Sequence, residues 1–403
     1  MADTYREVTT KSWGSRLKSS LGGVIFGLIL FLVGILVLFK NEGRAVTTAK
    51  SLAEGAGQVV SVPSDRTDPE REGRLIHFTG LAETSDLLED PVFGVRREAL
   101  RLRREVEMYQ WQEESHSETE TKVGGGTETV TTYTYDKGWS DRHHDSSTFK
   151  KPAGHENPEM PYTDAAWTAA DVSVGAFQLP EGFVERLSAY EPLHLEEGEE
   201  EGYPNGFRIT EAGNFYRGAT PSSPEVGDLR ITFEIVPEQN VSVVAQQVGN
   251  TVGPFPTEAG KPISMIRSGV ASADAMFQAA ERSNTVLTWV LRGVGLLLLF
   301  LAVRMILGPL AVLADVLPPI GALTRMGTSF VALLVALPVG LLVIAVAWVF
   351  YRPLLGITLV VLGVAGLVAL LVKTRKEARK ATPTAAPAPA AGAGDVPPPP
   401  PPP

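Results

Sequence analysis

The side chains best suited to chemistry in this chain of 403 residues are histidines, and they form one local group. His143, His144 and Asp145 are consecutive, and His155 and Glu156 follow soon after. Imidazoles and carboxylates are common zinc ligands and common general acids and bases. Adjacent residues of a strand point to opposite faces, so His143 and His144 cannot chelate one ion on regular backbone. We therefore predict no metal site, no cofactor and no catalytic residue here.

The remaining motifs also predict a protein that is not an enzyme. Gly124, Gly125 and Gly126 lack the lysine and hydroxyl of a phosphate-binding loop, and they predict a turn. The acidic run at 196–201 lacks the alternating ligands of a calcium loop and predicts a solvated loop. Cysteine is absent, which excludes disulfides, thiolate metal sites and a cysteine nucleophile. An extracytoplasmic hydrolase stays open as a distant alternative.

Two arginines stand inside a long apolar segment, residues 286–307. Arg292 and Arg304 are 12 residues apart, which is about 18 Å along a helix. Centred in a hydrocarbon core of ~30 Å, each reaches its own interface, so we predict that both anchor the ends of a span. The alternative is a buried charge that serves a pore or a partner. Asp315 is the only acidic residue between positions 286 and 372, and we hypothesise that it pairs with Arg304.

Apolar runs predict the helices that carry these charges. A bilayer core of ~30 Å requires about 20 apolar helical residues. Four runs meet this length, one near the start of the chain and three near its end: residues 21–39, 286–307, 329–350 and 354–372. Only Tyr351, Arg352 and Pro353 separate the last two, which predicts a tight hairpin. Gly23 and Gly27, one turn apart, favour the close approach of another helix, although glycine is common in spans without that role.

The distribution of charge predicts the topology. Residues 1–20 and 373–403 carry a net positive charge, and the loop 308–328 has Arg325 and the flanking Arg304, so we predict that all three segments are cytoplasmic. Residues 41–284 then lie outside; they carry 22 basic and 41 acidic side chains, a net charge of −19, against +9 for the remainder. So acidic a region argues against nucleic acid or anionic lipid as its main partner. Trp289 and Tyr351 fall at the predicted outer interface, as aromatic belts do.

Period-two alternation predicts a β-rich extracytoplasmic domain at residues 40–262. The runs 99–113 and 229–236 alternate apolar and polar side chains most clearly. Further predicted strands are 75–79, 92–95, 127–135, 172–179, 207–210, 214–217 and 241–246. An amphipathic helix at 263–285 leads into the second span, and the Pro/Ala-rich tail is predicted to be disordered. The predicted fold is a multipass α-helical membrane protein with four spans, 1 + 3, and a large α+β outer domain.

Several short runs resemble the transmembrane protein 43 family, also called LUMA. They are Asn41–Ala45, Ser51–Gly55, Arg103–Trp111, Gly227–Phe233 and Ser272–Phe277. One early span, a large outer domain and three clustered late spans are similar too, and only the proline tail has no counterpart. Members of that family are multipass membrane proteins, and eukaryotic members reside in the endoplasmic reticulum and inner nuclear membrane. The resemblance supplies no catalytic residues to carry over.

The resemblance implies a scaffold that organises membranes or membrane-protein complexes, because the family is linked to such organisation, including lamin and emerin binding. It predicts a homo-oligomer that contacts the lipid bilayer and other membrane proteins. Arginine outnumbers lysine by 24 to 12, which favours a bacterial member in the cytoplasmic membrane. The alternative function is a pore or transport subunit that uses Arg292 or Arg304.

Overall fold

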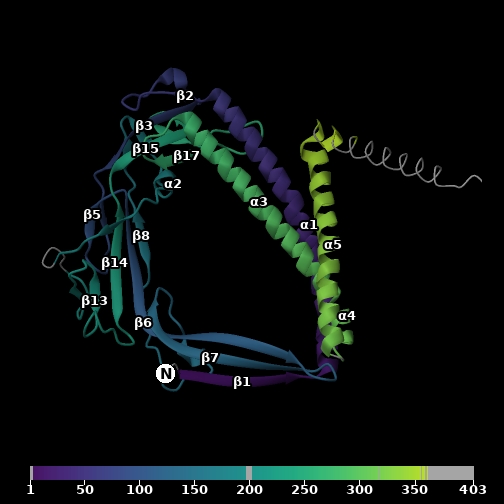
Figure 1. Cartoon of the computed structure of the whole chain (residues 1–403). Helices are drawn as coiled ribbons and strands as arrows, with labels where there is room; N and C mark the ends of the chain where they lie inside the picture. Colours follow the sequence, from purple (N-terminus) through teal and green to yellow (C-terminus); the bar gives the residue numbers. More distant parts are fainter. Residues whose placement is uncertain (1–2, 197–201, 317, 355, 359–360, 362–403) are drawn as a thin grey trace, which may run out of the picture. The chain divides into compact units, whose positions relative to one another are not determined.

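The first helix joins the membrane part of the chain to the β domain. The computed structural model describes residues 3–196, 202–316, 318–354, 356–358 and 361 (Figure 1). Within it, α1 (Trp13–Gln58) runs unbroken for 46 residues. Ser12 caps its start, because the Ser12 hydroxyl accepts a hydrogen bond from the backbone N–H of Ser15 at 3.3 Å. The predicted span 21–39 is thus one part of a longer helix that continues into the β domain.

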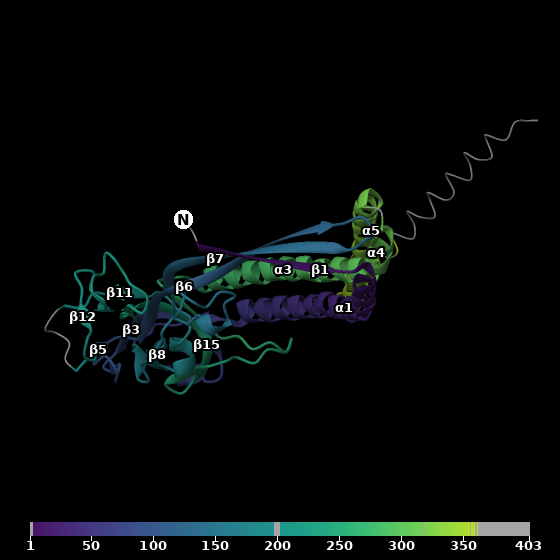
Figure 2. The same cartoon turned by 90° about the horizontal axis from the view of Figure 1, so that it is seen from below.

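Three helices carry the long apolar runs. The helices after α1 are α2 (Glu181–Val184), α3 (Ala273–Ile306), α4 (Gly308–Ala314) and α5 (Pro318–Tyr351), with 3-10 helices at Pro69–Arg71 and Ser146–Thr148. Among the described residues, three stretches are long and apolar enough to cross a membrane: Trp13–Gln58, Ala273–Ile306 and Met326–Tyr351. They contain the first three predicted spans. α1 and α3 lie side by side and antiparallel (Figures 1 and 2).

The chain divides after Ile344, within α5, and the second unit begins at Ala345. In that unit α5 ends at Tyr351, and a Cβ atom at Gly356 would lie 2.5 Å from the Cα of Val349. A straight helix would separate these two residues by about 10 Å, so the chain reverses here. The fourth predicted span, 354–372, lies mostly outside the described residues, and so does the tail 373–403.

The larger sheet brings together the two most clearly alternating runs of the sequence. In the described chain it has eight strands: β1 (Asp3–Lys11), β6 (Arg101–Thr121), β7 (Thr127–Ser140), β8 (Ala165–Thr168), β11 (Glu191–Leu193), β12 (Arg208–Ile209), β13 (Phe215–Arg217) and β14 (Leu229–Val236). Their order is β1-β7-β6-β14-β13-β12, with β8 on β6 and β11 on β14. β6 and β14 pair antiparallel from Arg101↔Val236 to Met108↔Leu229. Their apolar residues therefore share one face.

The second sheet packs on that face. Its seven strands within the described residues are β2 (Val60–Ser61), β3 (Leu75–Thr84), β9 (Val172–Val174), β10 (Phe177–Leu179), β15 (Gln239–Val248), β16 (Thr251–Gly253) and β17 (Met265–Ser268). They follow the order β17-β15-β16-β10-β9-β3-β2, and β15 also pairs with β3. β4 (Leu87–Glu89) and β5 (Arg96–Glu98) form a separate pair.

The domain core takes side chains from both sheets. Val106 and Ile231 of the first sheet and Phe78 and Val243 of the second belong to one cluster and are at most 1% exposed. A second, smaller cluster joins the domain to the helices: Leu52 of α1, Leu75 of β3, Val244 of β15, Ile263, and Met276 and Phe277 of α3. The end of α1 is therefore part of a hydrophobic core, which fixes the helix to the domain.

Three local predictions are wrong. Residues 172–179 are not one strand, because β9 and β10 form an antiparallel hairpin from Val172↔Leu179 to Val174↔Phe177. Residues 92–95 form a turn, because the Asp90 carboxylate accepts hydrogen bonds from the backbone N–H groups of Val92 and Phe93 at 2.7 and 3.1 Å. The helix predicted at 263–285 begins only at Ala273; Met265–Ser268 are β17, paired with β15. Apolar spacing there suits either structure, and the available edge of β15 decides between them.

The N-terminal segment 1–20, predicted only to be cytoplasmic, contains a strand that the sequence pattern does not predict. β1 pairs with β7 in antiparallel register, from Asp3↔Tyr135 to Lys11↔Thr127. With the outer half of β6 these strands form a three-stranded extension of the sheet, which we call the ribbon: residues 3–11, 111–121 and 127–135 (Figure 2). Residues 114–120 of the ribbon are all exposed. The N-terminal strand is thus part of the same sheet as the domain core.

Candidate functional site: polar contacts at the two ends of the first span

A buried ion pair joins α1 to α3 at the domain end of the first span. Arg292 donates from Nε to Oε1 of Glu42 at 2.6 Å and from Nη2 to Oε2 at 2.9 Å. Glu42 is 1% exposed and Arg292 15%. Two parallel hydrogen bonds between a guanidinium and a carboxylate fix both distance and orientation. Arg292 therefore clamps the two spans together, a role beyond the end anchoring that its position predicts.

A second arginine extends this contact away from the membrane. Arg44 donates to Oδ1 of Asn284 and Oγ1 of Thr288, each at 2.9 Å, and to Oδ1 of Asn41 at 3.2 Å. Asn284 in turn donates to the backbone carbonyl of Ala45 at 3.0 Å. Together with the Arg292 pair, the bonds to Asn284 and Thr288 join α1 to three successive turns of α3. They satisfy polar groups that the close packing of the two helices would otherwise bury unpaired.

The glycines predicted to favour close packing do face α3. A Cβ atom at Gly27 would lie 2.9 Å from the carbonyl oxygen of Ala302, whereas one at Gly23 would meet only Met305 at 3.9 Å. Gly34 lies against Leu299 in the same manner, at 3.1 Å. A larger residue at position 27 would therefore push the helices apart, while Gly23 is a looser contact.

The other end of the first span contacts the tip of the ribbon. Arg16 pairs with Asp315 at 2.5 Å, and Asp315 is 1% exposed. The indole Nε1 of Trp13 donates to the carbonyl of Val312 at 2.9 Å, and the backbone N–H of Gly124 donates to the carbonyl of Val316 at 3.0 Å. Arg16 also donates to the carbonyl oxygen of Gly125, at the turn predicted there. The starts of α1, the ribbon turn and the end of α4 therefore meet.

The hypothesised Arg304–Asp315 pair is wrong. Asp315 takes its cation from Arg16, and Arg304 is exposed with no ion pair to another described residue. Arg304 instead borders an apolar groove lined by Leu296, Phe300, Met326 and Phe330. Such a long, exposed cation on an apolar surface fits the predicted role of reaching towards an interface. The partner of Asp315 lies before the first span, 299 residues away in the chain, whereas the hypothesis considered only residues of the late spans and their loops.

The other residues predicted at the outer interface belong to different units of the chain: Trp289 to the first, and Tyr351 and Arg352 to the second. Trp289 is 65% exposed, and the guanidinium carbon of Arg292 lies 4.7 Å from the centre of its ring. Tyr351 packs edge-to-face on Phe350 at 5.3 Å, and the backbone N–H of Arg352 donates to the carbonyl of Trp348 at 2.7 Å. Trp289 and Arg292 thus act together on α3, whereas Tyr351 and Arg352 belong to the turn after α5.

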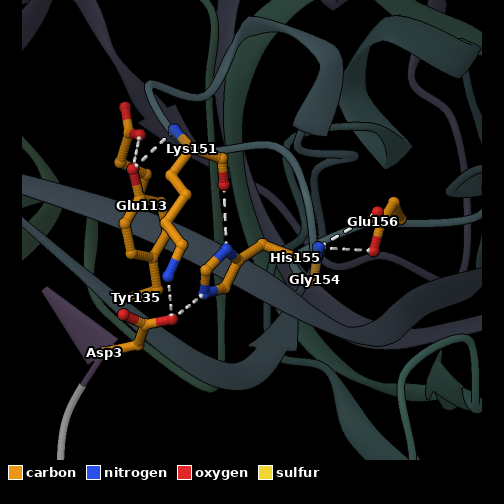
Figure 3. Close-up of polar contacts among 7 residues, drawn as sticks. All are labelled: Asp3, Glu113, Tyr135, Lys151, Gly154, His155 and Glu156. Carbon is orange, nitrogen blue, oxygen red and sulfur yellow. Dashed lines mark hydrogen bonds and ion pairs between the residues drawn. The ribbon is translucent and has the colours of Figure 1, made fainter. Parts of the chain in front are cut away.

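Of the histidine group, His155 docks the N-terminal strand (Figure 3). His143 and His144 instead contact the carbonyl oxygen of Pro158 and the hydroxyl of Ser140. His155 is 2% exposed, stacks on Tyr135 at 4.1 Å, and places Nδ1 2.8 Å from the carbonyl oxygen of Lys151. Its Nε2 lies 3.2 Å from a carboxylate oxygen of Asp3, which also accepts from Lys151 Nζ at 2.6 Å. Glu156 points elsewhere, to the backbone N–H of Gly154. Within the described residues no three metal-ligating side chains converge.

Two groups in this docking region have shifted pKa values. The hydrogen bond from Lys151 holds the pKa of Asp3 below its ordinary value. Burial, with a hydrogen bond to Glu113, raises the pKa of Tyr135 to about 12. Tyr135 therefore stays neutral at any physiological pH and donates to Glu113 at 2.7 Å. The contacts of Asp3 with Lys151 and His155 hold β1 in place within the ribbon.

Sequence reasoning missed two functional residues: Glu42, which pairs with Arg292, and Arg16, which pairs with Asp315. Glu42 had a signal, because an acidic residue three positions after an apolar run of 19 residues is costly there unless it has a partner. Arg16 had none, since a basic residue before a first span is ordinary.

Three apolar helices, closely packed around small residues and a buried ion pair, carry a β-rich domain; this architecture defines an integral membrane protein with an α+β domain. The chain belongs to the Transmembrane protein 43 family, whose model matches residues 108–353.

Transmembrane protein 43 of Homo sapiens is 37% identical over 377 residues, covering 91% of this chain and 93% of the human protein. The Mus musculus protein is 35% identical over 378 residues, with the same shares. The Drosophila melanogaster homolog is 32% identical over 360 residues, covering 87% of this chain and 95% of its own. No solved structure matches.

Proposed function

We propose that this chain is a non-enzymatic membrane scaffold that forms a homo-oligomer and organises other membrane proteins. One observation carries the proposal: the buried Glu42–Arg292 pair fixes the domain-bearing helix α1 to α3. A scaffold must hold its external surfaces in constant orientation towards the bilayer, which a flexible linker does not do. The hydrophobic cluster around Leu52 and Phe277 supports the same view, because it fixes both helices to the domain.

We also propose that the protein resides in the bacterial cytoplasmic membrane, with the domain core outside and the tail in the cytoplasm. The supporting observation is the charge difference between residues 41–284, at −19, and the remainder, at +9. Basic segments are retained on the cytoplasmic side during insertion. The exposed apolar surfaces of α3 and α5 offer contacts to lipid or to neighbouring spans.

The scaffold is tested by affinity purification from membranes in mild detergent, followed by native mass spectrometry. We expect the wild-type chain to be recovered as a homo-oligomer with other membrane proteins attached. Arg292→Met should reduce the amount of intact complex, because it leaves Glu42 buried without its cation. Arg282→Met is the matched control, since Arg282 is exposed on the same helix. A wild-type monomer without bound protein would contradict the proposal.

A pore or transport subunit is the second candidate, and the ribbon favours it. The domain contacts α1 at Leu52, and the ribbon tip contacts α1 at Trp13 and Arg16. The apolar run 21–39 thus lies between two contacts of one β unit. If that run crosses the bilayer, the polar ribbon passes the level of the hydrocarbon, where exposed sheet backbone is tolerated only against protein or water. An oligomer that encloses its ribbons would hold a water-filled path.

Introduced cysteines separate the two candidates, because the chain has none of its own. Val8 and Val130 are register partners, so Val8→Cys with Val130→Cys should form a disulfide. Val8→Cys with Glu118→Cys is the control, since β6 lies one strand further away. Impermeant maleimide then reports the side of Ser222→Cys, at an exposed loop of the β domain, and of Lys18→Cys before the span. A paired ribbon with the two sites on opposite sides, together with conductance in planar bilayers, supports the pore; both sites on one side removes it.

A further inference from the structure

A pocket of about 260 Å³ lies between α1, α3 and the loop before β17, beside the Arg44 contacts. Its polar lining includes Arg44, Thr48 and Ser51 from α1, Lys261 from the loop, and Ser283 from α3. Among the described residues no carboxylate lines it, although the surrounding region 41–284 carries a net charge of −19. The pocket is therefore a positive site within an acidic domain.

Both cations of the pocket are held in place by neutral groups. Arg44 donates to the Asn284 and Thr288 side chains, and Lys261 Nζ lies 3.2 Å from the hydroxyl of Thr48. Neither forms an ion pair with another described residue, and Nε of Arg44 has no acceptor among them. Two fixed, unpaired cations beside several hydroxyl donors are the groups that bind a phosphate.

The end of the pocket nearest the apolar run, at Arg44 and Leu287, stands at the level of lipid headgroups if residues 21–39 span the bilayer. Arg44 is five residues beyond the apolar run, about 7.5 Å along the helix axis. The polar layer of a bilayer extends roughly 5–8 Å beyond the hydrocarbon on each side. The apolar part of the lining, Leu52, Met265 and Leu287, includes a residue of the second predicted span. A lipid phosphate would thus meet the cations while its glycerol and chains meet apolar side chains.

We propose that this pocket binds the phosphate of an anionic lipid headgroup. Lys261 and Arg44 neutralise the phosphate, and the hydroxyls of Thr48, Ser51 and Ser283 supply further hydrogen bonds. Pockets of basic residues between membrane helices are a recurrent means of headgroup recognition. The inference is independent of the scaffold role, because it rests on the lining of the pocket and on its position beside the apolar run 21–39. The bound lipid would bridge α1, α3 and the domain loop.

The test uses the full-length chain in mild detergent with dioleoyl phosphatidylglycerol, and native mass spectrometry counts the retained lipid. We expect saturable binding of phosphatidylglycerol, with dioleoyl phosphatidylcholine bound at least ten-fold more weakly. Lys261→Gln should weaken binding about ten-fold without lowering the thermal midpoint, because Lys261 is an exposed loop residue. Lys50→Gln is the matched control, an exposed cation on α1 that does not line the pocket, and it should bind as the wild type does.

Three outcomes overturn the inference. Equal binding of phosphatidylglycerol by the wild type and Lys261→Gln would show that the pocket is not the site. Competition by inorganic phosphate at concentrations equal to those of the lipid would show a site for free phosphate instead of a headgroup. Where Arg44→Gln is also folded by its thermal midpoint, it should lose binding as Lys261→Gln does; unchanged binding by this variant also contradicts the inference.

Discussion

The β unit contacts the first span at two ends, and the two contacts are built differently. At the domain end, Leu52 enters a hydrophobic cluster and Glu42 is buried with Arg292. At the other end, the ribbon contributes a turn and a few hydrogen bonds around Arg16 and Asp315. Strand β6 serves both ends: Leu102 and Val106 of its inner half are fully buried, whereas residues 114–120 of its outer half are exposed. One strand can therefore combine a rigid core segment with a segment held only by its neighbours.

The largest loss of stability is expected from a substitution in the buried inner half of β6. Val106→Asp places an unpaired carboxylate where Val106 is 0% exposed, so we expect a loss of about 5 kcal/mol in the free energy of unfolding or no folded protein. Thr119→Asp in the outer half is the matched change, and it should alter stability by less than about 0.5 kcal/mol. Urea unfolding in detergent, followed by tryptophan fluorescence, measures both. Equal losses would mean that the two halves are not different.

The next effect concerns the ion pair at the domain end. Arg292→Met should destabilise the protein by about 3 kcal/mol, because Glu42 is then buried without a cation. Arg292→Lys should lose less, since it keeps the charge but not the two parallel hydrogen bonds. The double variant Glu42→Gln/Arg292→Met should recover part of the loss in thermal unfolding. Additive losses in this cycle would show that the two side chains are not coupled.

A smaller effect is expected at the ribbon end. Asp315→Asn removes a charge-assisted hydrogen bond worth about 1.5–3 kcal/mol, and we expect the ribbon turn to open more often while the core stays folded. Cleavage by trypsin at Lys122, in the turn of the ribbon, should become about ten-fold faster. Arg304→Lys is the control and should leave the rate unchanged. An equal rate in Asp315→Asn would mean that Arg16 does not hold the ribbon.

The smallest effect is a pH dependence confined to β1. Hydrogen bonds from Lys151 and Lys150 lower the pKa values of Asp3 and Glu7 from 3.8 and 4.5. A carboxylate with a lowered pKa stabilises the docked strand above its unfolded pKa, and that contribution is lost as the pH falls through the lowered value. Hydrogen exchange of β1 should thus accelerate below about pH 4.5. The variant Asp3→Asn/Glu7→Gln should show no such change over the same range.

The sequence predicts the core end well and the ribbon end poorly. Strand β14 has the predicted bounds 229–236, because its alternation matches the period of a strand whose one face is buried. The spans also follow from local composition. β1 could not be found in this way: most of its side chains are exposed, so its position depends on the edge of β7 rather than on its own pattern. The same limit applies to Arg16 and Asp315, which are 299 residues apart in the chain.

The unbroken course of α1 also makes the protein sensitive to the state of the bilayer. Its 46 residues correspond to a rod of about 69 Å, and turning this rod by 10° about its membrane end moves the other end by about 12 Å. Spans tilt when the hydrocarbon layer becomes thinner. Because no hinge interrupts the helix, a change in bilayer thickness that tilts the span would be converted into a sideways displacement of whatever the domain holds.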